Sequence, residues 1–111
     1  MSLLVRQSER FEIDVRLQAS WYLDQGAFTA ARDFARAVES TLAFLAIQPL
    51  IGPECDYPEP ELADLRVFLV QRPFKRFLIF YRVSATELHA FRVVHGMRDL
   101  PRRLLDPPGA E

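Results

Sequence analysis

The sequence predicts an α+β domain, in which two N-terminal antiparallel helices pack on a small, twisted, mainly antiparallel sheet of three to four strands. A short C-terminal helical turn follows the sheet. Two aromatic-rich apolar runs, 77–83 and 88–94, are separated by the polar break Ser84-Ala85-Thr86, which is typical of a β-hairpin. Upstream, apolar residues recur every three or four positions over 27–47, as they do on one face of a helix. The 111 residues are half apolar, which suits a single domain, 1–111.

The segment 11–23 carries two competing patterns. Apolar and charged or polar residues alternate along 11–19, which taken alone indicates a strand. Other apolar residues recur at helical spacing, however, and no turn signal precedes Gly26. A strand of this length would extend about 40 Å, too long for so small a sheet. We therefore predict a helix, with Ser8 as its N-cap and Glu9 in its first turn.

The remaining segments complete the sheet and connect it to the helices. Short strands are predicted at 3–6 and at 65–71, and the second of these forms an edge that is open to a partner strand. Between them, 48–64 contains four prolines and a run of acids, which predicts a loop without regular structure. The tail, 106–111, is expected to be frayed.

The hairpin strands are more apolar than a sheet with one wet face requires. Three arginines nevertheless interrupt them, and we expect these on a partly exposed face: Arg76, Arg82 and Arg92. His89 alternates with Arg92 and is expected at the surface.

Charge is divided unequally along a chain whose net charge is −1. Residues 1–64 include five basic and eleven acidic side chains, a net charge of −6, whereas 65–105 include nine basic and two acidic ones, a net charge of +7. Either the two halves attract one another across the fold, or the basic half forms a functional surface.

Cys55 is the only cysteine, so an internal disulfide is excluded, and its neighbours offer no metal ligands. We therefore predict neither a metal site nor a cofactor. The apolar runs are too short for a secretion signal or a membrane span, so we expect a cytoplasmic protein that does not bind membranes.

The run F-L-I-F-Y-R-V, followed by L-H-A-F-R-V-V-H-G-M-R-D-L, resembles the C-terminal half of the ParE/RelE toxin superfamily, and its ParE branch most closely. Further similarity, in S-E-R-F-E-I-D-V, Trp21-Tyr22 and Pro49-Leu50-Ile51-Gly52, extends over nearly the whole chain. The resemblance implies a plasmid-stabilisation toxin of a type II toxin–antitoxin module. Such a toxin binds a protein target, DNA gyrase, and is neutralised by a cognate antitoxin whose disordered C-terminal segment folds on it.

The RelE branch implies a different activity, messenger-RNA cleavage, which requires proton transfer and cations on the scissile phosphate. The resemblance then assigns phosphate binding to Arg76 and Arg98, with His95 as the proton-transfer candidate. The third position of that site, a tyrosine or histidine in RelE-type enzymes, falls near Leu104, which departs from the pattern. Structural roles compete: a hydrogen bond from the His95 imidazole to the backbone, and a local ion pair or helix cap at Arg98-Asp99.

Two binding surfaces are predicted under the toxin hypothesis. The target surface is expected at Arg98, Arg102 and Arg103. The antitoxin surface is expected at Trp21, Tyr22, Phe28 and Phe44. These aromatic residues would otherwise pack between the helices and the sheet. Because the pI is about 6.1 and toxins of this superfamily are usually basic, an inactive homologue that only binds antitoxin is a further alternative.

Overall fold

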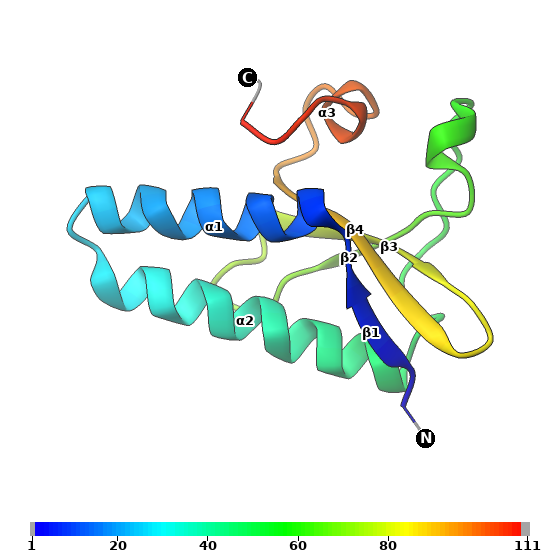
Figure 1. Ribbon diagram of the computed structural model, residues 1–111, viewed down its shortest axis with the longest axis horizontal. Helices are drawn as coiled ribbons and strands as arrows, with labels where there is room; N and C mark the ends of the chain where they lie inside the picture. The colour runs from blue at the N-terminus through cyan, green and yellow to red at the C-terminus, as the bar shows by residue number, and fades with distance from the viewer. Residues whose placement is uncertain (1, 110–111) are drawn as a thin grey trace.

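The computed structural model describes residues 2–109 and has the predicted α+β architecture (Figure 1). Its elements in chain order are β1 (Leu4–Gln7), α1 (Glu9–Asp24), α2 (Phe28–Ile47), the 3-10 helix η1 (Pro60–Leu62), β2 (Arg66–Leu69), β3 (Phe77–Val83), β4 (Glu87–His95) and α3 (Arg102–Leu105). The four strands form one sheet in the order β1-β4-β3-β2. Only the β1–β4 pair is parallel, so the prediction of a mainly antiparallel sheet is confirmed.

Helix α1 begins at the predicted cap. The amide of Phe11 donates to Ser8 Oγ at 3.0 Å. Glu9 and Glu12 lie in the first turn, where their negative charges interact favourably with the positive end of the helix dipole. Phe11 is fully buried, and Val15 and Tyr22 pack on the same core. These three residues follow the helical spacing, which therefore prevails over the alternation in the sequence.

Helix α2 supplies most of the helical side of the core on one face of the sheet. Phe34 is fully buried, and its ring contacts those of Phe74 and Phe77 at centroid distances of 5.4 and 4.7 Å. Thr41 is also buried. Its hydroxyl donates to the Ala37 carbonyl within the helix and accepts from the amide of Gln71, just past β2. One side chain thus ties α2 to the end of the edge strand. Across residues 2–109, no helix is both long and apolar enough to cross a membrane.

The opposite face of the sheet is covered as well, which explains why the hairpin strands are so apolar. Leu62 of η1 and Leu104 of α3 are buried there against Phe80 and Val94. Figure 1 shows η1 and α3 on the far side of the sheet from α1 and α2. The prediction that 48–64 has no regular structure is therefore wrong at η1, whose buried leucine anchors the proline-rich segment.

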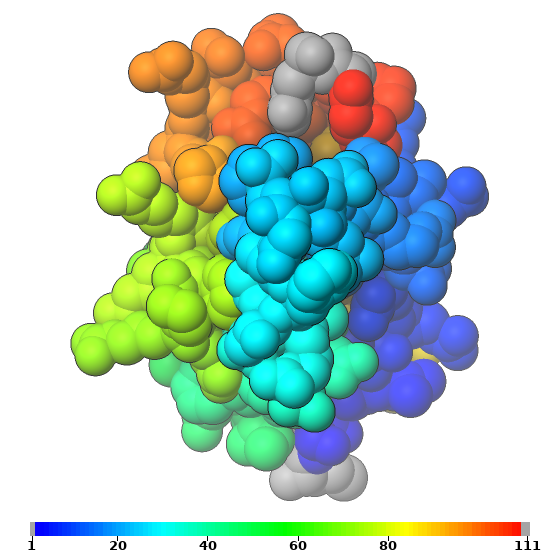
Figure 2. All heavy atoms as spheres, turned by 90° about the vertical axis from the view of Figure 1, so that its left-hand side faces the viewer, coloured from blue at the N-terminus to red at the C-terminus, as the bar shows by residue number. Residues whose placement is uncertain are grey.

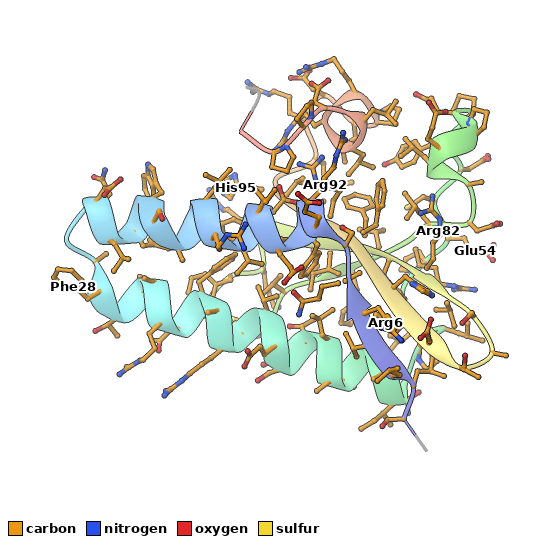
Figure 3. All side chains as sticks on the ribbon, in the orientation of Figure 1. Arg6, Phe28, Glu54, Arg82, Arg92 and His95 are labelled. Carbon is orange, nitrogen blue, oxygen red and sulfur yellow. The ribbon has the colours of Figure 1, made fainter. Side chains whose placement is uncertain are left out.

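A β-bulge in β4 changes which way its side chains point. Tyr81 pairs with Ala90 and Phe80 pairs with Arg92, so Phe91 is the extra residue. In a bulge of this kind, two consecutive side chains project from the same face. Arg92 consequently points toward α1 and α3 and is only 3% exposed, so the expectation that it lies on a partly exposed face is wrong (Figure 3).

Arg92 and Asp14 form a buried bidentate ion pair. The guanidinium Nε and Nη2 lie 2.7 and 2.9 Å from the two carboxylate oxygens of Asp14. Nη1 donates to the carbonyls of Arg103, Leu104 and Asp106, at the C-terminal end of α3, where helix carbonyls need donors from outside the helix. Asp14 also accepts the amide of Val93, at 3.1 Å.

Replacing Asp14 with alanine should lower the free energy of unfolding by about 3–5 kcal/mol, because the buried guanidinium of Arg92 loses its counter-ion. Urea denaturation followed by circular dichroism measures this change. Arg16→Ala, on the exposed side of the same helix, is the matched control and should cost under about 0.5 kcal/mol. Equal losses in the two variants would contradict the assigned role of the pair.

Gly52 lies where no side chain fits. A Cβ atom there would lie 2.5 Å from Tyr81 Oη and 2.7 Å from the Val67 carbonyl oxygen. Tyr81 is fully buried, donates to the Pro49 carbonyl at 2.8 Å and accepts the Gly52 amide at 3.1 Å. Burial raises the pKa of the Tyr81 hydroxyl above its ordinary value.

Substituting Gly52 with alanine should destabilise the fold by about 1–3 kcal/mol, because the new methyl group overlaps one backbone atom and one buried hydroxyl. Thermal unfolding tests this expectation. The neighbouring, half-exposed Ile51 provides the control substitution, Ile51→Ala, which should have a smaller effect. An unchanged melting temperature for Gly52→Ala would show that the segment moves freely away from the sheet.

Candidate functional site

One end of the sheet brings together the three residues proposed for ribonuclease chemistry. Phe77 pairs with His95 at the open end of the β3–β4 hairpin, away from its turn. The Gly96 amide donates to the Arg76 carbonyl at 2.7 Å. Gly96 adopts a φ of 75°, which turns the chain so that Arg98 follows at the same end. The backbone therefore delivers Arg76, His95 and Arg98 to one edge, although each side chain is exposed.

The His95 imidazole packs against a ring instead of the backbone. Its centroid lies 4.9 Å from that of Phe77, with an edge-on angle of 70°. Within residues 2–109, no hydrogen bond joins this imidazole to the backbone, so the predicted positioning role of His95 is wrong. The ring is accessible at the mouth of two adjoining hollows.

Arg98 and Asp99 do not form the expected ion pair. The Asp99 carboxylate instead faces Arg102, at 3.4 Å, while its carbonyl accepts the amide of Arg103. Asp99 has a positive φ of 61° at the turn before α3, and the capping position is occupied by Pro101, with no side-chain cap. The Arg98 carbonyl accepts a hydrogen bond from the Arg103 guanidinium at 3.0 Å, and the Arg98 side chain is exposed.

Leu104, near which the resemblance put the third position of a RelE-type site, has an inert side chain. Leu104 is fully buried in the second core, where it packs with Leu62 and Phe80. It can neither donate nor accept a proton. Among residues 2–109, no group of three or more metal-binding side chains gathers either. The end of the sheet thus presents cations and one imidazole, without a second acid or base at the expected place.

Three of the four aromatic residues predicted to bind antitoxin gather at the turn between α1 and α2. Trp21 and Phe28 are 54% and 69% exposed, whereas Tyr22 is half-buried against Phe34. A hollow of about 410 Å³ lies between Trp21, Tyr22 and the sheet end. Figure 2 looks onto this turn, with segments 70–78 and 96–103 beside it.

Phe44 lies apart from that group. It follows Phe28 by 16 helical positions, roughly 24 Å along α2. Its ring stacks on Phe68 of β2, with centroids 5.8 Å apart and an interplanar angle of 29°. The predicted aromatic surface is therefore two separate patches, because Phe28 begins α2 and Phe44 lies in its last turn.

The sequence was compared with protein-family models and with solved structures. A model described as the ParE toxin of the type II toxin–antitoxin system parDE matches residues 5–100. The chain belongs to the ParE toxin family. This confirms the resemblance found in the hairpin and its flanking motifs. No curated protein matched the toxin in a direct sequence comparison.

Solved structures share the fold at low sequence identity. The chromosomal ParDE system of P. aeruginosa is similar with a TM-score of 0.68 and 14% identity, covering 86% of the toxin and 98% of that chain. The RelBE2 toxin–antitoxin complex of Mycobacterium tuberculosis follows with a TM-score of 0.58 and 21% identity, covering 86% and 99%. At such identities the likeness concerns architecture alone.

The toxin also has a row of basic side chains near the 84–86 turn of the hairpin, which was not predicted from the sequence. Arg6 and Arg82 flank His89 across three strands and line a hollow of about 540 Å³. Each is already engaged: Arg6 and His89 contact Glu87 at 2.7 and 3.2 Å, and Arg82 donates to two backbone carbonyls. The strand register was the signal that could have predicted the row. We assign it a structural role.

Glu87 ties β1 to β4 through this row. The hydrogen bond from Arg6 holds the pKa of the Glu87 carboxyl below its usual range, and partial desolvation opposes that lowering. A lowered folded-state pKa means that the pair stabilises the fold above the unfolded-state pKa. That stabilisation is lost as pH falls through the folded value.

Glu87→Gln should therefore lower the melting temperature near neutral pH, and its difference from wild type should shrink as pH falls from about 5 to about 3. Melting curves at a series of pH values measure this. Glu39→Gln, on the exposed face of α2, is the control and should change stability less at neutral pH. A Glu87→Gln deficit that persists at low pH would assign the effect to packing rather than charge.

Proposed function

We propose that the toxin stops bacterial growth by binding DNA gyrase through a protein–protein contact, and that a cognate antitoxin neutralises it. Membership in the ParE family supports the toxin role. The observation that carries the choice of a binding mechanism is Leu104, which is 0% exposed where a RelE-type enzyme requires a proton-transfer group. A gyrase target also implies that the toxin acts in the cytoplasm.

The target contact is proposed at the basic segment formed by Arg98, Arg102 and Arg103. These side chains project around α3, whose position is held by the buried guanidinium of Arg92. Arg102 is 61% exposed and bridges Asp99 and Asp106. Clustered cations on a fixed backbone favour association with an acidic protein surface and steer its approach.

The antitoxin contact is proposed at the helical hairpin. Trp21, Tyr22 and Phe28 form one aromatic patch, and Phe44 forms another on the same helix pair. Aromatic anchors of this kind commonly carry most of the binding energy at an interface. Two separate patches on one helix pair suit a long segment that folds as it binds, and the two similar structures are described as toxin–antitoxin systems.

A second candidate is RelE-like cleavage of messenger RNA. Its support is the arrival of Arg76, His95 and Arg98 at one sheet edge. In that case His95 would move a proton while the two arginines neutralise phosphate.

The two candidates predict opposite results for two variants. Arg98→Ala/Arg102→Ala/Arg103→Ala should weaken inhibition of gyrase supercoiling by at least about tenfold, because the proposed contact loses three charges. His95→Ala should leave that inhibition within about twofold of wild type. Supercoiling assays with purified toxin measure both effects, and thermal unfolding checks that the variants are folded.

A toxin that leaves gyrase active but cleaves messenger RNA on ribosomes would overturn the proposal. Loss of that cleavage in His95→Ala would then support the second candidate. A folded toxin that neither arrests growth nor inhibits gyrase would instead match the inactive homologue.

A further inference from the structure

An apolar groove runs along the outer part of β2, on the face of the sheet opposite α1 and α2. It encloses about 360 Å³ and is lined almost wholly by apolar side chains, including Tyr57, Val67, Leu69, Leu78, Met97 and Leu100. Its floor is the sheet, and its two banks are the proline-rich loop and the segment that precedes α3. This volume lies near the lower end of the range for ligand pockets, which are mostly apolar.

The groove opens at a stretch of sheet edge that the protein leaves uncovered. The proline-rich loop pairs with the first half of β2: Cys55 donates to the Leu65 carbonyl, and Val67 donates to the Pro53 carbonyl. The Val70 amide donates to the Phe77 carbonyl of the neighbouring strand β3. Because successive residues of a strand direct their backbone groups to opposite sides, the amide and carbonyl of Leu69 point away from β3, toward the open edge. Among the described residues, no backbone group pairs with the outward amide of Leu69.

Met97 is held out over this opening. Its side chain is 76% exposed, and Leu69 on the strand below is 46% exposed. The turn that presents Met97 is bounded by Gly96 and Asp99, both at positive φ. An unbranched thioether adapts to differently shaped apolar partners, which makes exposed methionine typical of binding surfaces.

The two banks differ in charge. The loop bank contains only acids among its charged residues: Glu54, Asp56, Glu59, Glu61 and Asp64. The opposite bank leads directly into the basic segment, beginning with Arg98. An occupant must therefore be apolar at its centre and acidic on the side that faces Arg98.

We infer that the groove receives an extended segment of the target protein, which pairs with Leu69 and inserts one large apolar side chain between Tyr57 and Met97. Acidic residues of the same segment face Arg98. This inference rests on the proposed function, because it takes the target to be a protein. The target is the occupant because the groove is continuous with the basic segment and lies across the sheet from the patch of Trp21, Tyr22 and Phe28 proposed for antitoxin. Phe44 reaches the groove only at its rim, where its ring stacks on Phe68.

The test replaces the two exposed apolar residues without changing charge. Leu69→Asn/Met97→Asn should restore growth of bacteria in which the toxin is induced, and should raise the concentration that inhibits DNA gyrase by at least about tenfold. Leu50→Asn/Ile51→Asn is the matched control, because these neighbours are 64% and 48% exposed and line no part of the groove. Leu69→Met/Met97→Leu keeps the groove apolar and should retain toxicity. Circular dichroism establishes that every variant is folded.

Unchanged growth arrest by folded Leu69→Asn/Met97→Asn would overturn the inference. So would a variant that still arrests growth but no longer binds antitoxin, or a toxin dimer that this variant converts to monomers. Relief of arrest by the variant, with wild-type toxin inactive on gyrase, would keep the groove as a target site and reject gyrase as the target. Wild-type toxin that fails to arrest growth would overturn both proposals.

Discussion

The structure depends on one buried arginine. Arg92 lies on β4, binds Asp14 of α1 through two parallel contacts, and donates to three carbonyls at the end of α3. Only a guanidinium offers enough donors in one rigid plane to hold three elements at once. A lysine would bring the same charge without this geometry.

The ion pair also supplies a hydrogen-bond acceptor where β4 extends beyond the end of β1. Strand β1 ends at Gln7, so the edge of β4 beyond it lacks a neighbouring strand. Asp14 accepts the amide of Val93 at that edge, and α1 takes over the place of the missing strand. A shorter β1 is tolerated because a helix carboxylate satisfies the backbone donor that it leaves.

Local features of the fold were predictable from the sequence, and long-range ones were not. The hairpin, α2 and the Ser8 cap each depend on residues a few positions apart, so pattern and propensity were sufficient. The burial of Arg92 depends on a bulge and on Asp14, 78 positions away, and neither leaves a signal in the sequence. Periodicity placed Phe28 and Phe44 on one helix, but it could not show that they pack in different parts of the molecule. Phe28 lies at the turn between the helices, and Phe44 stacks on Phe68 of β2.

The same distinction applies to the candidate site and to charge. The resemblance to the toxin superfamily grouped Arg76 with His95 and Arg98, whereas the contact between His95 and Phe77 depends on side-chain packing at the end of the sheet, which no local pattern encodes. The unequal division of charge along the chain had two explanations, attraction between the two halves and an exposed basic surface. Each applies to different residues. Arg66 and Arg92 pair with acids of the N-terminal half, at Glu54 and Asp14, while Arg98 remains at the surface.

The parallel pairing of β1 with β4 has a consequence for how the toxin is made. Ser8, at the end of the first strand, bonds to Phe91, 83 positions later in the chain. During synthesis the helical hairpin leaves the ribosome first, but its apolar face has no sheet to cover until the last strand emerges. Most of the chain must therefore be translated before the fold closes.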